Sequence, residues 1–237
     1  MTDKRMIVAL DFPDLEQVGE MVERLGDTVS YYKVGMELFY GAGREAVSLL
    51  RAAGKEVFLD LKLHDIPNTV SQSVRVLTGL GATMFNVHAA GGPAMMRAAA
   101  QAASEAAIAF GRPRPKLIAV TVLTSMDATE WACLNQATPI GEQVVHLAKL
   151  AREAGLDGVV ASPQEAAAIR AACGPDFLIV TPGVRPAGSA ANDQSRTATP
   201  AGALKAGASH LVVGRPITAA PDPRAAAEAI LREMGEA

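Results

Sequence analysis

Two patterns of apolar and polar positions alternate along the chain. The first is a short apolar run rich in Val, Ile and Leu, often without a polar face, which is typical of a strand buried on both sides of a parallel sheet. The predicted strands are Met6–Asp11, Ser30–Val34, Val57–Lys62, Thr83–His88, Lys116–Thr121, Asp157–Ala161, Phe177–Thr181 and Ser209–Gly214.

The second pattern is an apolar stripe with a period of 3.6 residues, which predicts helices between the strands. Several of these segments begin at Pro, a residue favoured in the first turn of a helix, and several end near Gly, which suits a helix C-terminus. The predicted helices are Leu15–Leu25, Arg44–Ala53, Val70–Leu80, Pro93–Phe110, Gly141–Ala154, Pro163–Ala172, Pro200–Ala206 and Pro223–Met234.

Eight alternating strand–helix units in 237 residues fit a TIM (β/α)8 barrel better than an open doubly wound sheet. The sequence has no linker and no break in composition. We therefore expect an α/β fold with a single barrel domain over residues 1–237.

Composition narrows the function classes. Hydrophobic residues make up 49% of the chain and charged residues 20%, which excludes a disordered protein. The net charge of −3 and the lack of a basic stripe argue against a nucleic-acid partner. Cys133 and Cys173 have no metal-ligand spacing, and we expect no bound metal and no disulfide framework. With no signal peptide and no apolar run of about 18 residues, we expect a cytoplasmic protein that does not enter the membrane.

Charged residues gather at the ends of the first three predicted strands, where the active sites of such barrels lie. They are Asp11, Lys33, Asp60 and Lys62, and Asp65 follows shortly after. Burying Asp60, Lys62 and Asp65 so close together is costly unless they are paired and used. An alternating Lys33–Asp60–Lys62–Asp65 charge network would keep Lys62 protonated, as a proton donor or a stabiliser of a carbanion.

Simpler interpretations exist for the same residues. Asp11 could cap the following helix, Lys33 could lie on the rim, and Asp60 with Lys62 could form a structural ion pair. His88 is more readily explained as a packed barrel residue than as a catalyst.

A phosphate site is predicted at the other side of the barrel mouth. Loops after strands 7 and 8 commonly bind phosphate in such barrels, and Gly214 and Arg215 end the eighth predicted strand. Gln194 lies in the long segment 182–199, which is rich in Gly, Pro, Ala and Ser and has the position of a lid over the site.

With these residues in view, the chain resembles the bacterial orotidine 5′-phosphate decarboxylases along nearly its whole length. The most specific motif is the segment 58–69, FLDLKLHDIPNT. The other matching segments are Ala9–Asp11, Lys33–Gly35, Val87–Ala89, Val122–Ser125, Thr181–Pro186, Asp193–Gln194 and Val213–Ile217.

The resemblance implies a carboxy-lyase, a carbon–carbon lyase that converts orotidine 5′-phosphate to UMP in pyrimidine biosynthesis. It implies a homodimer without metal or organic cofactor. Lys62 would protonate C6, Asp60 would lie beside the departing carboxylate, and Asp65 and Thr69 would reach into the neighbouring subunit's site.

The resemblance also assigns the substrate-binding residues. Asp11 and Lys33 would hold the ribose hydroxyls, and Thr124 would contact the pyrimidine. The phosphate would be bound by Arg185, Gln194, Gly214 and Arg215.

Two alternatives stay open. One is a Mg²⁺-dependent barrel of the same superfamily, a 3-keto-gulonate-6-phosphate decarboxylase or a hexulose-phosphate synthase, which share the Asp-x-Lys-x-x-Asp pattern. The residues Ile66 to Thr69 after Asp65 favour the orotidylate enzyme. The other is a non-catalytic phosphate-binding barrel, which would have no need for Lys62 between acids.

Overall fold

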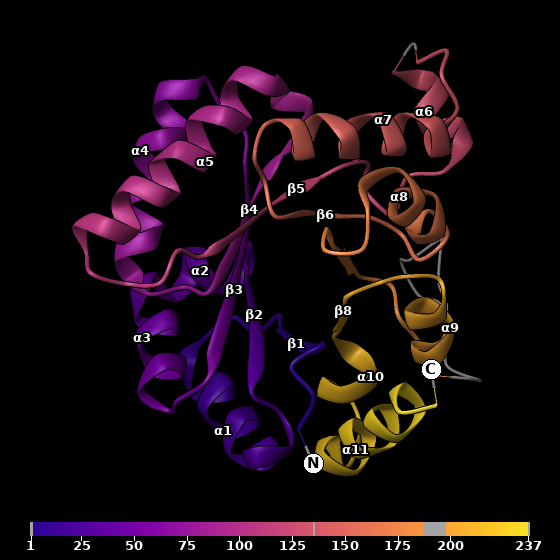
Figure 1. Ribbon diagram of the computed structural model, residues 1–237. Helices are drawn as coiled ribbons and strands as arrows, with labels where there is room; N and C mark the ends of the chain where they lie inside the picture. The colour runs from indigo at the N-terminus through magenta and orange to yellow at the C-terminus, as the bar shows by residue number, and fades with distance from the viewer. Residues whose placement is uncertain (1, 135, 187–197, 237) are drawn as a thin grey trace.

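Eight parallel strands pair in sequence order and close into a barrel in the computed structural model, which describes residues 2–134, 136–186 and 198–236 (Figure 1). The first strand pairs with both the second and the eighth, so the sheet has no free edge. This confirms the predicted single-domain TIM barrel. The strands are β1 (Met6–Leu10), β2 (Tyr31–Gly35), β3 (Glu56–Leu63), β4 (Met84–His88), β5 (Lys116–Val120), β6 (Gly158–Val160), β7 (Leu178–Thr181) and β8 (His210–Val213).

Helices surround the barrel, and the last of them, α11, packs against α1 and α9 to close the ring (Figure 1). The main helices of the ring are α1 (Leu15–Leu25), α3 (Arg44–Ala52), α4 (Pro67–Leu80), α5 (Gly92–Ala109), α7 (Ile140–Glu153), α8 (Ala166–Cys173), α9 (Pro200–Lys205) and α11 (Pro223–Met234). Each of them overlaps a predicted helix.

The structure contains short helices that the sequence pattern did not predict. They are α2 (Met36–Ala42), α6 (Ala128–Cys133), α10 (Arg215–Thr218), and the 3₁₀ turns η1 (Gly26–Thr28) and η2 (Ala89–Gly91). All but η1, which continues from α1, come after a strand. Segments of one or two turns are too short to show a helical period, which is why the pattern missed them. Helix α8 also begins three residues later than predicted, because the Glu165 side chain accepts a hydrogen bond from the Ser162 amide and forms a turn there.

The hydrophobic core has two parts, as expected for strands buried on both faces. The larger part lies between the barrel and its helices. The smaller one fills the barrel interior, and its buried members are Ile7, Ala9, Tyr31, Phe58, Met84, Ile118, Val180 and Val212. The interior is therefore packed rather than open, and the residues above this layer line the mouth of the barrel.

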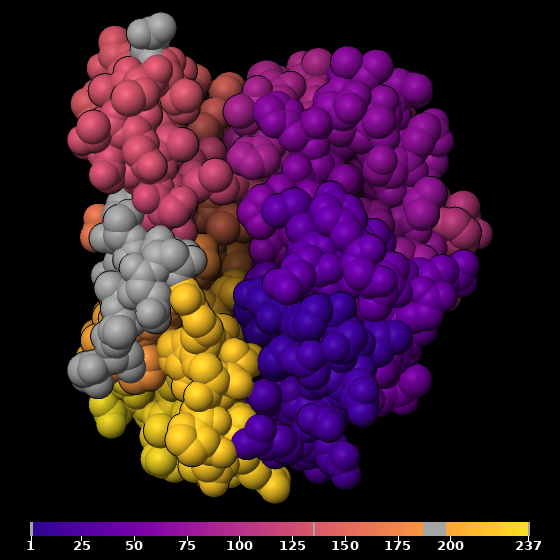
Figure 2. All heavy atoms as spheres, turned by 180° about the vertical axis from the view of Figure 1, so that it is seen from behind, coloured from indigo at the N-terminus to yellow at the C-terminus, as the bar shows by residue number. Residues whose placement is uncertain are grey.

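The two halves of the chain form opposite sides of the molecule. Figure 2 shows the early residues, indigo to purple, on one side and the later ones, pink to yellow, on the other. Within the described ranges, no helix has the length and apolar character needed to cross a bilayer.

Candidate active site

Strand β3 is interrupted by a bulge where it reaches the mouth of the barrel. Its register with β4 shifts between Leu59 and Leu63, so three residues of β3 face the single residue Asn86 of β4. Lys62 lies in this bulge with a φ of 53°. That left-handed conformation costs a non-glycine residue on the order of 1–3 kcal/mol. The local structure therefore holds Lys62 in a strained conformation that the strand alone would not adopt.

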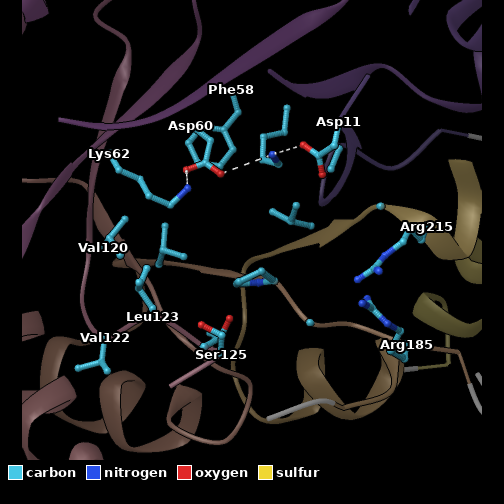
Figure 3. A pocket seen from close by; sticks show the side chains of 18 residues that line it. Asp11, Phe58, Asp60, Lys62, Val120, Val122, Leu123, Ser125, Arg185 and Arg215 are labelled. Atoms are coloured by element: carbon cyan, nitrogen blue, oxygen red, sulfur yellow. Dashed lines mark hydrogen bonds and ion pairs between the residues drawn. The ribbon is translucent and has the colours of Figure 1, made fainter. Parts of the chain in front are cut away.

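The predicted charges of the first three strands meet in one array. The Lys62 ammonium lies 2.7 Å from Oδ1 of Asp60, and the Lys33 ammonium lies 3.5 Å from Oδ2 of the same carboxylate. Lys33 also contacts Oδ1 of Asp11 at 2.9 Å. Dashed lines in Figure 3 mark these contacts. Asp60 thus bridges two ammonium groups, and Asp11 ends the array at the more exposed side.

Burial and charge act in opposite directions on Asp60. Burial by itself raises the pKa of this carboxyl group, but the charges of Lys33 and Lys62, with hydrogen bonds from Lys62 and Asn86, outweigh it and hold the pKa below its ordinary value. Asp60 is therefore a carboxylate at neutral pH, and the array carries two positive charges around one buried negative charge.

Asp11 does not cap the following helix, which was one alternative for this residue. The N-cap of α1 is Asp14, whose carboxylate accepts a hydrogen bond from the Gln17 amide. Asp11 instead reaches Lys33 over Gly35, where an added Cβ would lie 2.9 Å from the Lys33 ammonium nitrogen. Gly35 leaves room for the contact between Lys33 and Asp11.

The expectation of three buried neighbouring charges is wrong for Asp65. This residue is exposed, and its carboxylate accepts a hydrogen bond from the Ile66 amide at 2.7 Å. No ion pair joins it to Lys62 among the residues that the structure describes. The bulge turns the chain away from the cavity after Lys62, so Asp65 and Thr69 line a separate hollow on the outer surface. Within one chain, the network consists of Asp11, Lys33, Asp60 and Lys62.

Two arginines face each other across the cavity from the array. Figure 3 shows Arg185 and Arg215 pointing toward one another, on the side opposite Asp60 and Lys62. Arg185 follows a bridge between Val184 and Ala198, and its Nε is buried without a hydrogen-bond partner in the described part of the chain. Burial and the charge of Arg215 lower the pKa of Arg185. Two guanidinium groups placed this way form a ready site for an anion.

The array and the arginines share one cavity of about 320 Å³ at the mouth of the barrel. Thr124 and Ser125, which follow β5, line one wall, and Gly214 lies beside Arg215. The backbone at Gly183 and apolar side chains form the remaining surface, and these side chains are Ala9, Phe58, Val120, Val122, Leu123, Val160, Pro182 and Val212. The volume and the mixture of an apolar lining with a few charged groups are those of a small-molecule site.

Most of the predicted site residues lie in this cavity, and a few do not. The cavity brings together Asp11, Lys33, Asp60, Lys62, Thr124, Arg185, Gly214 and Arg215. Asp65 and Thr69 lie in the outer hollow. Gln194, together with positions 187–197 of the predicted lid, lies outside the described residues, so the lid stays a prediction.

His88 lies outside the cavity, in the outer hollow beside Asp65. Its ring stacks on that of His64, with centroids 5.3 Å apart. Burial, with the nearby His64 and Lys62, lowers the pKa of His88. This packing agrees with the interpretation of His88 as a structural residue.

No role was predicted for Asn86, although its side chain accepts a hydrogen bond from the Lys62 amide and donates one to the Asp60 carboxylate. A polar residue inside an otherwise apolar strand, next to the strand that carries the Asp-x-Lys motif, was the available signal.

Comparison with known protein families places this geometry among related proteins. Residues 4–230 match the model of the family described as "Orotidine 5'-phosphate decarboxylase / HUMPS family". A protein from Moorella thermoacetica named orotidine 5′-phosphate decarboxylase is 58% identical over 231 residues, which cover 97% of this chain and 92% of the relative.

Two further proteins with the same name show the same similarity. The one from Trichlorobacter lovleyi is 52% identical over 97% of this chain and 95% of its own length. The crystal structure of the one from Lactobacillus acidophilus superposes with a TM-score of 0.85 at 45% identity, covering 98% of this chain and 99% of that chain.

Proposed function

Since the chain belongs to the orotidine 5′-phosphate decarboxylase / HUMPS family, we propose that its cavity converts orotidine 5′-phosphate to UMP and CO₂, with Lys62 as the proton donor to C6. The reaction is that of a carboxy-lyase and is the last step of de novo pyrimidine biosynthesis. One observation carries the proposal: the Lys33–Asp60–Lys62 array and the facing pair Arg185 and Arg215 lie in the same cavity.

The two ends of the cavity match the two ends of the substrate. Arg185 and Arg215 bind the phosphate, and Gly214 beside them allows the phosphate to approach the backbone. Asp11 and Lys33 bind the ribose hydroxyls, and Thr124 contacts the pyrimidine. Gln194 completes the phosphate site in this proposal.

In the chemical step, the bond between C6 and the carboxylate carbon breaks and CO₂ leaves. The electron pair of that bond remains on C6, in an orbital that the ring π system does not delocalise. Lys62 then gives one ammonium proton to C6, which forms UMP, and the resulting neutral amine regains a proton from water. A fixed ammonium group where negative charge develops stabilises the transition state electrostatically.

Asp60 serves this step in two ways. Its carboxylate holds the Lys62 ammonium at 2.7 Å, so the proton donor is already oriented before substrate binds. Because its pKa lies below the ordinary value, it is also charged at neutral pH and faces the substrate carboxylate. The departing CO₂ removes that unfavourable contact.

We also propose that the protein acts as a homodimer in which Asp65 and Thr69 complete the partner's site. The hollow that contains them is bordered by apolar side chains that water contacts in the single chain: Tyr40 is 75% exposed and Met36 is 42% exposed. An exposed apolar surface around a carboxylate that has no role in its own cavity supports a contact between two copies.

Subunit exchange tests the shared site. Lys62→Ala and Asp65→Ala homodimers should each be nearly inactive, whereas mixed dimers should recover one intact site and part of the activity. Verified heterodimers that stay inactive would show that Asp65 does not act across the interface.

Turnover in the presence of a chelator tests the activity itself. Purified protein should convert orotidine 5′-phosphate to UMP with EDTA present, followed by the change in ultraviolet absorbance. Turnover that strictly requires added Mg²⁺ would favour the sugar-phosphate enzymes of the superfamily. Binding of UMP without any turnover would favour a phosphate-binding barrel.

For location, we propose the cytoplasm. Both cysteines are free thiols, and Cys133 is exposed. Free exposed thiols are typical of proteins in a reducing compartment.

A further inference from the structure

Asn86 is a polar residue in the most buried part of strand β4. It is 1% exposed, and its two neighbours Phe85 and Val87 are fully buried in the hydrophobic core. It does not line the cavity, so it has no direct contact with a substrate there. A buried amide is retained in such a place only if its donors and acceptor are satisfied.

Its side chain joins the two functional residues of β3. The Lys62 amide donates a hydrogen bond to Oδ1 of Asn86 at 2.8 Å, and Nδ2 of Asn86 donates to Oδ1 of Asp60, also at 2.8 Å. The orientation of the amide is fixed by chemistry, because a backbone N–H requires an acceptor and a carboxylate requires a donor. Few other side chains could make both bonds at once.

The bulge in β3 explains why this amide is needed. Three residues of β3 face Asn86 alone, so the backbone ladder with β4 cannot pair each of them. The side chain of Asn86 takes the place of a ladder acceptor for the Lys62 amide. Without it, the N–H of a residue with a φ of 53° would lose the bond that holds its conformation.

The same amide also fixes the carboxylate that orients the ammonium of Lys62. Oδ1 of Asp60 accepts one bond from Nδ2 of Asn86 and one from Nζ of Lys62, at 2.8 and 2.7 Å. The backbone and the side chain of Lys62 are therefore both held, directly or through Asp60, by one residue on the neighbouring strand.

We propose that Asn86 is a positioning residue of the decarboxylation site, which sets the place of the Lys62 ammonium relative to Asp60. The inference rests on the proposed function, because it concerns the proton donor of that reaction. Asn86 acts through Lys62 and Asp60 and leaves the binding of phosphate, ribose and base to other residues.

Two variants test the proposal. In Asn86→Ala both bonds are lost, and kcat should fall by roughly 100-fold, the loss expected when a reacting group moves by about 1 Å. The affinity for UMP, measured by calorimetry, should stay unchanged, because UMP has no carboxylate and does not need the proton donor. Thermal unfolding of each variant establishes that it is folded.

The second variant, Asn86→Asp, keeps the acceptor for the Lys62 amide and replaces the donor by a titrating group. The new carboxyl would share a proton with Asp60, and the titratable groups around this pair are Lys62 on β3, Lys33 on β2, His88 on β4 and Asp11 after β1. With one proton on the pair, the donor is restored. As pH rises and that proton leaves, kcat should fall, giving a descending limb at lower pH than any in wild type.

Thr83→Val is the matched control. Thr83 directly precedes β4, and its hydroxyl bonds the Val57 backbone of β3 at the opposite end of the barrel. This variant should lose stability while keeping kcat and the wild-type pH profile. It therefore distinguishes the general effect of losing a side-chain hydrogen bond to β3 from the specific effect of losing the Asn86 contacts.

Two results would overturn the proposal. One is a wild-type kcat in Asn86→Ala. The other is a loss of kcat in Asn86→Ala that is matched by a loss of UMP affinity, together with a wild-type pH profile in Asn86→Asp. That combination is the outcome of a merely structural role. Wild-type turnover in the same assay separates these results from a failure of the proposed function.

Discussion

Asp60→Asn removes one negative charge and leaves the size of the side chain unchanged. In the native array that charge lies 2.7 Å from the Lys62 ammonium and 3.5 Å from that of Lys33. Lys33 keeps Asp11 at 2.9 Å after the change. For Lys62, Asp60 is the ion partner that the described structure provides. The substitution therefore leaves mainly the Lys62 ammonium without a neighbouring negative charge.

The expected cost follows from the burial of the array. Removing one partner of a buried ion pair destabilises a protein by 3–5 kcal/mol. The side chain of Lys62 is 26% exposed, so water offsets part of that cost. We expect Asp60→Asn to lower the free energy of unfolding by about 3 kcal/mol, the lower end of the range. Activity should be lost as well, because the ammonium is no longer held in place.

A double-mutant cycle in urea measures the coupling directly. Wild type, Asp60→Asn, Lys62→Met and the double variant are each unfolded in urea. The effect of Met on the strained backbone at position 62 cancels from the coupling energy, because both variants that carry Met share it. Contacting charged residues should give a coupling energy of about 0.5–3 kcal/mol. Additive effects, or an Asp60→Asn variant as stable as wild type, would refute the reasoning that the array is one electrostatic unit.

The remaining predictions concern the phosphate site, pH and backbone strain. Arg215→Ala should weaken UMP binding by about 10- to 100-fold in calorimetry, the value of hydrogen bonds to a charged group, and leave orotidine binding unchanged. Arg24→Ala on α1 is its control, and equal losses for nucleotide and nucleoside would remove Arg215 from the phosphate site. The stabilisation from Asp60, whose folded pKa is lowered, is present above its unfolded pKa of about 3.9 and is lost as pH falls through the folded value. The stability gap between wild type and Asp60→Asn should therefore be constant from about pH 7 to 5 and close toward pH 3, and a gap that widens on acidification would contradict this sign. Lys62→Gly should be about 1 kcal/mol more stable than Lys62→Ala in urea, because Gly adopts a φ of 53° without strain, and equal stability would show that Lys62 is not strained.

The barrel could be predicted from the sequence because its signals are local. Each strand is a short apolar run, and the eight helices of the ring carry an apolar stripe, as in α1 with Val18, Met21, Val22 and Leu25 buried. The position of the charges at the strand ends could be predicted from the alternation of side chains along a strand. Asp60 and Lys62 lie on the same side of β3 as Phe58, which fills the barrel interior. Where the local pattern agrees with the fold, the sequence is sufficient to predict the structural element.

The rest depended on contacts between strands, which sequence proximity does not give. Asp65 is three residues from Lys62, yet the bulge and the start of α4 turn it to the outer surface. Asn86 is 24 residues from Lys62, yet it is the residue that bonds its amide. The bulge explains both differences, and the pattern of apolar and polar residues did not predict a bulge.

Restoring an amine at position 62 tests the role of Lys62 most directly. In a Cys133→Ser background, which removes the exposed thiol, Lys62→Cys should bind UMP but be inactive. Alkylation with 2-bromoethylamine rebuilds a side chain of nearly lysine length that ends in an ammonium. The account predicts that decarboxylation of orotidine 5′-phosphate returns on alkylation, and that a neutral reagent of similar size restores nothing. An alkylated protein that binds UMP as wild type does, but remains as inactive as the unmodified variant, would contradict the assignment of Lys62 as the proton donor.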